Sequence, residues 1–162
     1  MRRCCRLIFT LLVIGAILVG CAPATEKTVS CQGLTITLPS NCMDLSGEEY
    51  AKELDFLYAC SIGSFLGVRE LRSELEETYP ALTLENYARL QIKATGQDCQ
   101  LERKDGIYTY TYTAQSGTES ITYISAVFET ADAFWAVQAY CVRADFPENQ
   151  AKLWKYLASV KV

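Results

Sequence analysis

Apolar and polar residues alternate with a period of two in several segments of the chain, a pattern typical of β-strands with one buried face. The clearest alternation runs from Gly33 to Leu38 and from Ile107 to Thr113. Residues 121–130 and 134–142 are apolar at nearly every position, as expected for strands covered on both faces. The predicted strands are 33–38, 56–61, 65–71, 107–113, 121–130 and 134–142.

Helical periodicity predicts a short helix ending near Asp55 and longer helices over residues 84–95 and 146–159. The stripe of the last helix contains Leu153 and Leu157. The expected capping residues are Ser46 with Glu49 for the short helix, Thr83 with Gly96 for the middle one, and Asp145 with Glu148 for the last.

The order of these elements predicts an α+β fold. Consecutive strands joined by short turns, such as Lys104-Asp105-Gly106, must pair antiparallel. Helices before and after the late strands can cover both faces of one sheet. We therefore expect an α/β/α sandwich around a twisted, mainly antiparallel sheet.

The N-terminal segment has the three parts of a secretory signal. Arg2, Arg3 and Arg6 precede an uncharged apolar run over residues 7–19. This run is shorter than the roughly 20 residues of a permanent membrane helix, although an uncleaved anchor is the alternative. Leu18-Val19-Gly20-Cys21 follows the pattern of a bacterial lipobox.

Cys21 is the expected lipidation site, because only a thiol can form the thioether to diacylglycerol. The acyl chains would hold the protein on the extracytoplasmic face of the cell membrane, or on the outer membrane if the host has one. We expect residues 1–20 to be a cleaved signal peptide, 21–30 a lipidated flexible tether, and 31–162 a single domain.

Charge and composition exclude several functions. The chain has 15 basic and 19 acidic residues, and three of the basic ones but none of the acidic ones precede Cys21, so the mature chain carries −7. This charge argues against a nucleic-acid partner. The absence of histidine excludes Ser-His-Asp and Cys-His catalysis and histidine-ligated zinc. We expect no catalytic residues, metal or cofactor.

The expected domain contains an odd number of cysteines, so at least one stays unpaired within a monomer. Cys60 and Cys141 lie in apolar strands, which favours buried free thiols. Cys31, Cys42 and Cys99 lie near the ends of elements and are better disulfide candidates. The pairing stays open.

Tyr108, Tyr110 and Tyr112 fall on one face of the strand over 107–113. They could form a stacking platform for a ligand or a partner, since a phenol has a flat apolar body and a polar tip. The alternative, which we favour, is a half-buried sheet face under a helix. Trp135 and Trp154 are expected in the core by the same reasoning.

Three segments resemble the PsbP-like superfamily, which includes an extrinsic photosystem subunit, a yeast Ran-release factor and many small bacterial lipoproteins. They are Gly33–Pro39 (GLTITLP), Leu82–Ala88 (LTLENYA) and Asp132–Gln138 (DAFWAVQ). The resemblance spans roughly residues 31–162 and rests on core and capping residues. It implies an α/β/α fold and a binding or assembly role, with no shared catalytic residues.

These observations together predict a lipid-anchored, non-catalytic binding or interaction module of the bacterial cell envelope. One alternative is an accessory subunit or chaperone for another envelope protein, which would expose a broad apolar patch. The other is a carboxylate-dependent envelope hydrolase, which needs two convergent carboxylates.

Overall fold

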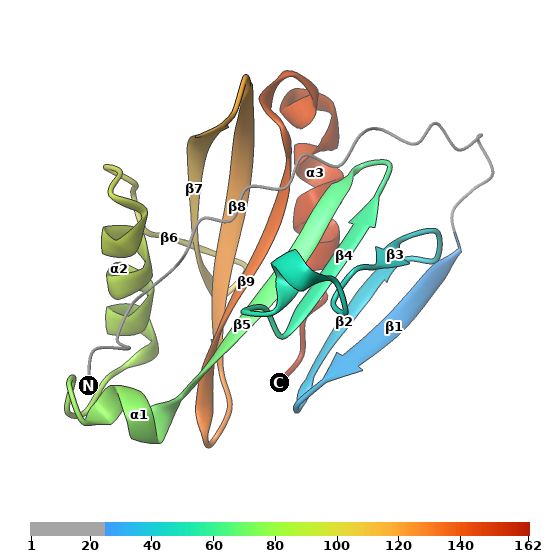
Figure 1. The fold of residues 1–162 in the computed structure, drawn as a ribbon. Helices are drawn as coiled ribbons and strands as arrows, with labels where there is room; N and C mark the ends of the chain where they lie inside the picture. The colour runs from blue at the N-terminus through green and yellow to red at the C-terminus, as the bar shows by residue number, and fades with distance from the viewer. Residues whose placement is uncertain (1–24) are drawn as a thin grey trace.

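A seven-stranded antiparallel sheet forms the centre of the protein in the computed structural model, which describes residues 25–162. Its spatial order is β3-β4-β5-β9-β8-β7-β6 (Figure 1). The strands are β3 (Met43–Asp44), β4 (Phe56–Cys60), β5 (Gly63–Leu71), β6 (Glu102–Lys104), β7 (Ile107–Ser116), β8 (Glu119–Glu129) and β9 (Ala133–Val142). The α+β fold with a mainly antiparallel sheet is confirmed.

Helices cover both faces of this sheet (Figure 1). Residues of β9 alternate between the two sides, as the pleat of a strand requires. Trp135 and Val137 pack in one core cluster with the C-terminal helix α3 (Phe146–Leu157), whereas Phe134 and Ala136 pack in another with α2 (Leu84–Thr95). The continuously apolar sequence of β9 therefore reflects burial on both faces, as expected.

A second, two-stranded sheet is made by β1 (Glu26–Cys31) and β2 (Leu34–Pro39). Its turn at Gln32 and Gly33 has positive φ at both residues. The expectation of a flexible tether through residue 30 is wrong for 26–30, because these residues pair with β2 along its whole length. Strand β1 is mostly polar and lies at the edge of its sheet. Its sequence therefore shows little of the hydrophobic alternation from which a strand could be predicted.

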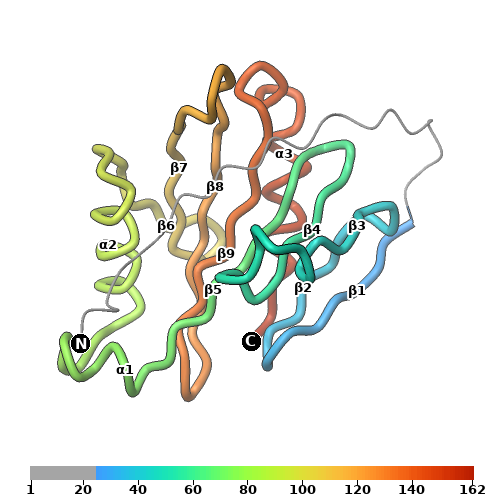
Figure 2. Tube along the Cα trace, in the orientation of Figure 1, coloured from blue at the N-terminus to red at the C-terminus, as the bar shows by residue number. Residues whose placement is uncertain are grey.

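The N-terminal hairpin and the C-terminal end of the chain lie side by side (Figure 2). The backbone N–H of Thr35 donates to the carbonyl of Lys161 at 2.8 Å, and that of Lys161 donates back at 2.9 Å. Leu34, Ile36 and Leu38 of β2 join the core cluster that contains Leu153 and Leu157. The hairpin thus closes one side of the core beneath α3.

The helix caps in the structure agree only in part with those predicted from the sequence. Thr83 accepts a hydrogen bond from the N–H of Asn86, and Gly96 ends α2 in the left-handed conformation, as predicted. The predicted capping box at Ser46 is wrong. Its hydroxyl accepts from the N–H of Leu57 at 2.9 Å, and only a 3₁₀ turn, η1 (Glu49–Ala51), follows.

The last helix is likewise capped differently. Asp145 makes no side-chain capping bond, because it belongs to the 3₁₀ turn η2 (Arg143–Asp145) that leads into α3. Trp135 is fully buried as expected, whereas Trp154 is partly buried and its indole N–H donates to Asp105. Within residues 25–162, no helix is long and apolar enough to cross a membrane.

Candidate partner-binding surface

The tyrosine ladder of β7 lies on the sheet face that α2 partly covers. Tyr110 and Tyr112 are only 2% and 5% exposed, and Tyr112 stacks on Tyr123 of β8 with 4.8 Å between ring centroids. Tyr108 is half-buried and donates to Glu85 of α2. Burial raises the pKa of Tyr110 to about 12, so its phenol stays protonated. The structure places Tyr110 and Tyr112 in the core and Tyr108 at its margin, and a ligand-binding role for the three stays a prediction.

A group of buried and partly buried polar side chains lies between α2 and the sheet, and sequence reasoning missed it. Glu70, near the end of β5, accepts hydrogen bonds of 2.7 Å from the hydroxyl of Tyr87 and from the amide of Gln91. Gln91 is buried, although its place on a helix with polar neighbours gave no sign of this. The group attaches α2 to the sheet and holds a single carboxylate, so it lacks the pair that glycoside hydrolysis requires.

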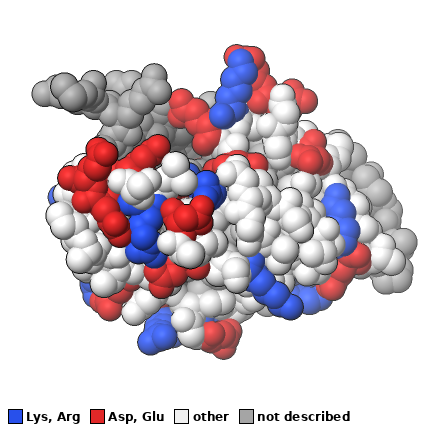
Figure 3. Space-filling view, turned by 90° about the horizontal axis from the view of Figure 1, so that it is seen from below, with Lys and Arg blue, Asp and Glu red and all other residues white. Residues whose placement is uncertain are grey.

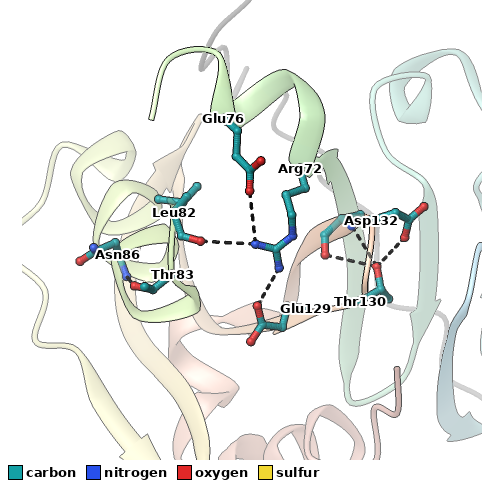
Figure 4. Close-up of polar contacts among 9 residues, drawn as sticks. Arg72, Glu76, Leu82, Thr83, Asn86, Glu129, Thr130 and Asp132 are labelled. Atoms are coloured by element: carbon teal, nitrogen blue, oxygen red, sulfur yellow. Dashed lines mark hydrogen bonds and ion pairs between the residues drawn. The ribbon is translucent and has the colours of Figure 1, made fainter. Parts of the chain in front are cut away.

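Charged side chains gather where β5 ends, next to the β8–β9 turn and the short helix α1 (Arg72–Glu76). We call this set the arginine edge and define it as Arg69, Arg72, Glu76, Glu129 and Asp132. Figure 4 shows the guanidinium of Arg72 pointing between Glu76 and Glu129. The set joins β5 and the adjoining α1 to the end of β8 and the β8–β9 turn, which lie much later in the sequence.

Arg72 is held from several sides. Its guanidinium lies 2.8 Å from Glu129 and 3.8 Å from Glu76, and it donates to the carbonyl of Leu82 at 3.4 Å. It also stacks over the ring of Phe134, 4.2 Å from the ring centroid, which adds a cation–π contact. This many partners fix the guanidinium in one position, and the carboxylates that bind it are fixed with it.

Arg69 links the same edge to the N-terminal hairpin. Its guanidinium binds Asp132 and donates to Gln32 in the β1–β2 turn. Its backbone N–H donates to Asp55, which also accepts from Gln32. The hydrogen bond from Thr130 and the nearby Arg69 lower the pKa of Asp132, so that carboxylate stays ionised at neutral pH.

The outer surface of the arginine edge is acidic. The Asp132 side chain is 69% exposed, whereas that of Arg69 is only 16% exposed. Figure 3, which views the molecule from below, shows acidic side chains surrounding basic ones on this side. Glu74 and Glu77 of the α1 region are exposed as well. A partner that docks here would meet carboxylates held in place by guanidinium groups behind them.

Glu129 and Asp132 lie close together at the end of the predicted strand 121–130, but the sequence does not identify their arginine partners. Arg69 and Arg72 stand about 60 residues earlier, and only the β5–β9 pairing, with Leu71 opposite Ala133, brings them together. Opposite charges at the ends of two predicted strands were the available signal. The pairing of those strands was not predictable from turn lengths.

The remaining predicted site residues are dispersed or lie outside the described residues. Leu18, Val19, Gly20 and Cys21 precede residue 25, so the lipobox stays a prediction. Cys31, Cys42, Cys60, Cys99 and Cys141 are all free thiols in the structure. Between residues 25 and 162, no cluster of thiols and carboxylates is placed to hold a metal ion.

Comparison with known proteins identifies the fold. No protein-family model and no curated protein matches the chain. The solution structure of the cyanobacterial PsbP (CyanoP) from Synechocystis sp. PCC 6803 matches 90% of this chain and 98% of its own, with 9% identity and a TM-score of 0.57.

A crystal structure from Bacteroides thetaiotaomicron VPI-5482 matches 80% of this chain with 11% identity and a TM-score of 0.55. The match covers 45% of that longer chain. Identities this low show the architecture alone. The chain has a PsbP-like fold.

Proposed function

We propose that the protein is a lipid-anchored, non-catalytic binding module of the bacterial cell envelope, and that it contacts a protein partner through the arginine edge. The observation that carries the proposal is the ion-pair network there. Arg69 and Arg72 are largely covered, and they hold Glu76, Glu129 and Asp132 in fixed positions on the outside.

Pre-organised carboxylates favour a partner with basic side chains. The network presents ordered carboxylates to solvent in addition to joining α1 to the end of β8, because the side chains of Glu76, Glu129 and Asp132 are 44–69% exposed. Groups fixed before binding lose less conformational entropy when a partner docks. Electrostatic complementarity would then set the rate and orientation of association.

The rest of the described surface favours polar over apolar recognition. Among residues 25–162, the large hydrophobic side chains that are exposed are Met43 and Val162. A chaperone that holds unfolded clients would need a broader apolar surface. We therefore prefer a module with a defined protein partner to a general holding chaperone.

The partner surface can be tested by photocrosslinking in intact cells. A photoreactive amino acid at position 76 should capture one discrete protein, and the charge-removing changes Glu129→Gln and Asp132→Asn should lower the yield at least several-fold. Two controls accompany this experiment. A probe at Glu148 on α3 should capture much less of the partner. The control change Glu119→Gln in the β7–β8 hairpin should leave the yield of the position 76 probe unchanged. Equal capture at both sites, or no dependence on the carboxylates, would contradict the proposal.

Anchoring is tested separately at Cys21. The Cys21→Ala protein should incorporate no lipid label and should stay unprocessed, because alanine has no thiol to form the thioether. Metabolic labelling with a fatty acid analogue and electrophoretic mobility measure both effects. Cys31→Ala is the matched control and should be labelled and processed normally. Lipid labelling of the Cys21→Ala protein would disprove the anchor.

A further inference from the structure

Two cysteines face each other across neighbouring strands on the α3 side of the sheet. The register pairs Met43 with Ala59 and Asp44 with Tyr58, so the next pair along the same ladder is Cys42 with Cys60. The N–H of Leu45 donates to the carbonyl of Leu57 at 2.8 Å, which makes that pair a hydrogen-bonded one. Pairs alternate along an antiparallel ladder, so Cys42 and Cys60 occupy a non-hydrogen-bonded position, where side chains lie closest.

The separation at such a position suits a disulfide. Opposite Cα atoms of a non-hydrogen-bonded pair lie about 4.5 Å apart, within the roughly 4.4–6.8 Å range of disulfides. The two thiols lie close enough to influence each other's pKa. Both belong to the same core cluster, with Cys42 buried and Cys60 partly exposed.

The surroundings of Cys60 favour its thiolate. The neighbouring Cys42 thiol lowers the pKa of Cys60 against the effect of burial, with smaller contributions in the same direction from the backbone of the β4–β5 turn. The Cys60 thiol itself donates to the carbonyl of Gly63 at 3.4 Å. Lys27 adds a positive charge nearby, and its ammonium group is held by the carbonyl of Cys42 at 2.6 Å. The neighbouring Cys60 and burial raise the pKa of Cys42, which keeps its proton, although the charge of Lys27 acts in the opposite direction. One thiol is thus prepared as nucleophile and the other as proton donor.

None of the other described cysteines is placed to form a disulfide with Cys42 or Cys60. Cys60 on β4 pairs with Gly63 on β5. Because Ser64 pairs with Tyr140, the next position of that ladder sets Gly63 beside Cys141 on β9, so Gly63 lies between the two cysteines. Two strand spacings separate Cys60 from Cys141, about 10 Å, which is too far for a disulfide. Cys31 donates to the carbonyl of Asp55 near the opposite end of β4. Cys99 packs with the tyrosines on the other face of the sheet.

From this geometry we propose that Cys42 and Cys60 are a redox-active pair that closes a cross-strand disulfide by exchange with a disulfide-bearing oxidant. The Cys60 thiolate attacks one sulfur of the oxidant, forms a mixed disulfide and releases one thiolate. The Cys42 sulfur then attacks Cys60 and expels the second thiolate. The protons of the two cysteines pass to these leaving groups, and the two electrons lost by the pair reduce the oxidant to two thiols.

The bridge would fasten the edge strand β3, and the segment that carries η1, to β4. It would leave Cys31, Cys99 and Cys141 as thiols. This pairing selects one of the predicted disulfide candidates, Cys42. Its partner is Cys60, for which the sequence favoured a free thiol.

The experiment uses the purified lipidated chain in detergent, folded, with glutathione disulfide as oxidant. After oxidation the protein is unfolded, alkylated and mapped by mass spectrometry. The wild type should lose two alkylatable thiols and yield a linked peptide pair that contains Cys42 and Cys60. Bridge formation should raise the melting temperature by about 5–10 °C, and dithiothreitol should reverse both changes.

Three variants assign the roles. Cys42→Ser should stop at a glutathione adduct on Cys60, Cys60→Ser should form no bridge, and the matched control Cys141→Ser should form the same bridge as the wild type. Peptide mapping of the wild type does not depend on how well these variants fold. Recovery of both Cys42 and Cys60 as alkylated thiols after oxidation of the folded wild type would overturn the proposal. A bridge between any other two cysteines would do the same.

Discussion

Replacing Trp135 with alanine should lower the free energy of unfolding by about 4 kcal/mol, as large-to-small changes of buried aromatic residues do. Trp135 is fully buried at the centre of the sheet, and its ring lies 6.3 Å from that of Phe56 between centroids. It shares a core cluster with Leu153 and Leu157 of α3. The cavity would therefore open between the sheet and the helix, and the midpoint of thermal unfolding should fall by about 10–15 °C.

Two matched changes separate packing from polar effects. The indole N–H of Trp135 has no hydrogen-bond partner among the described residues. Trp135→Phe therefore loses volume but no hydrogen bond, and should cost only about 1–2 kcal/mol. Trp154→Ala removes a partly buried indole and should cost less than Trp135→Ala. Urea unfolding followed by circular dichroism measures all three, and equal losses at both tryptophans would contradict the assignment of Trp135 to the core.

The elements that sequence predicted best are those whose local signals and tertiary surroundings agree. Helix α2 begins after Thr83 and ends at Gly96, where the cap residues placed its ends. The continuously apolar sequence of β9 matches its burial, and the alternation of β7 does so at Tyr110, Thr111 and Tyr112, although Thr109 is buried as well. In each case the residues needed for the local conformation are also those that suit the core, so the pattern alone was sufficient.

Other elements depended on contacts between distant segments. Strand β1 is nearly all polar and becomes a strand because β2 offers it a partner through a two-residue turn. Glycine is unfavourable inside a strand. Gly67 nevertheless occupies such a position in β5, because the ring of Phe56 fills the space that a Cβ would need, within 2.1 Å. The local sequence does not predict which aromatic ring will pack against which glycine.

The two candidate sites illustrate the same limit. The arginine edge needs β5 beside β9, and the Cys42–Cys60 pair needs the β3–β4 register. The sequence contains the right kinds of residue for both sites, with Cys42 near the end of an element and Cys60 in an apolar strand. It could not select the partners, because a shift of one residue in register would exchange the two faces of the sheet.

Replacing Gly63 with alanine should destabilise the sheet strongly, although the change adds a single methyl group. Gly63 has φ of +140°, a conformation that L side chains rarely adopt, and an added Cβ would lie 2.3 Å from the carbonyl oxygen of Tyr140. The same atom would be 3.1 Å from Leu153 of α3 and 3.2 Å from Cys141. Because a backbone oxygen cannot turn away as a side chain can, β5 must move from β9 or the substituted turn must refold.

We expect Gly63→Ala to cost about 3 kcal/mol or more in the free energy of unfolding, from backbone strain and overpacking together. Gly47→Ala is the matched control, since Gly47 has no atom within 4 Å of the added Cβ and its φ is not positive. Its stability should change by less than about 0.5 kcal/mol. Equal stabilities of the two variants in urea would mean that β5 and β9 do not approach as closely as described.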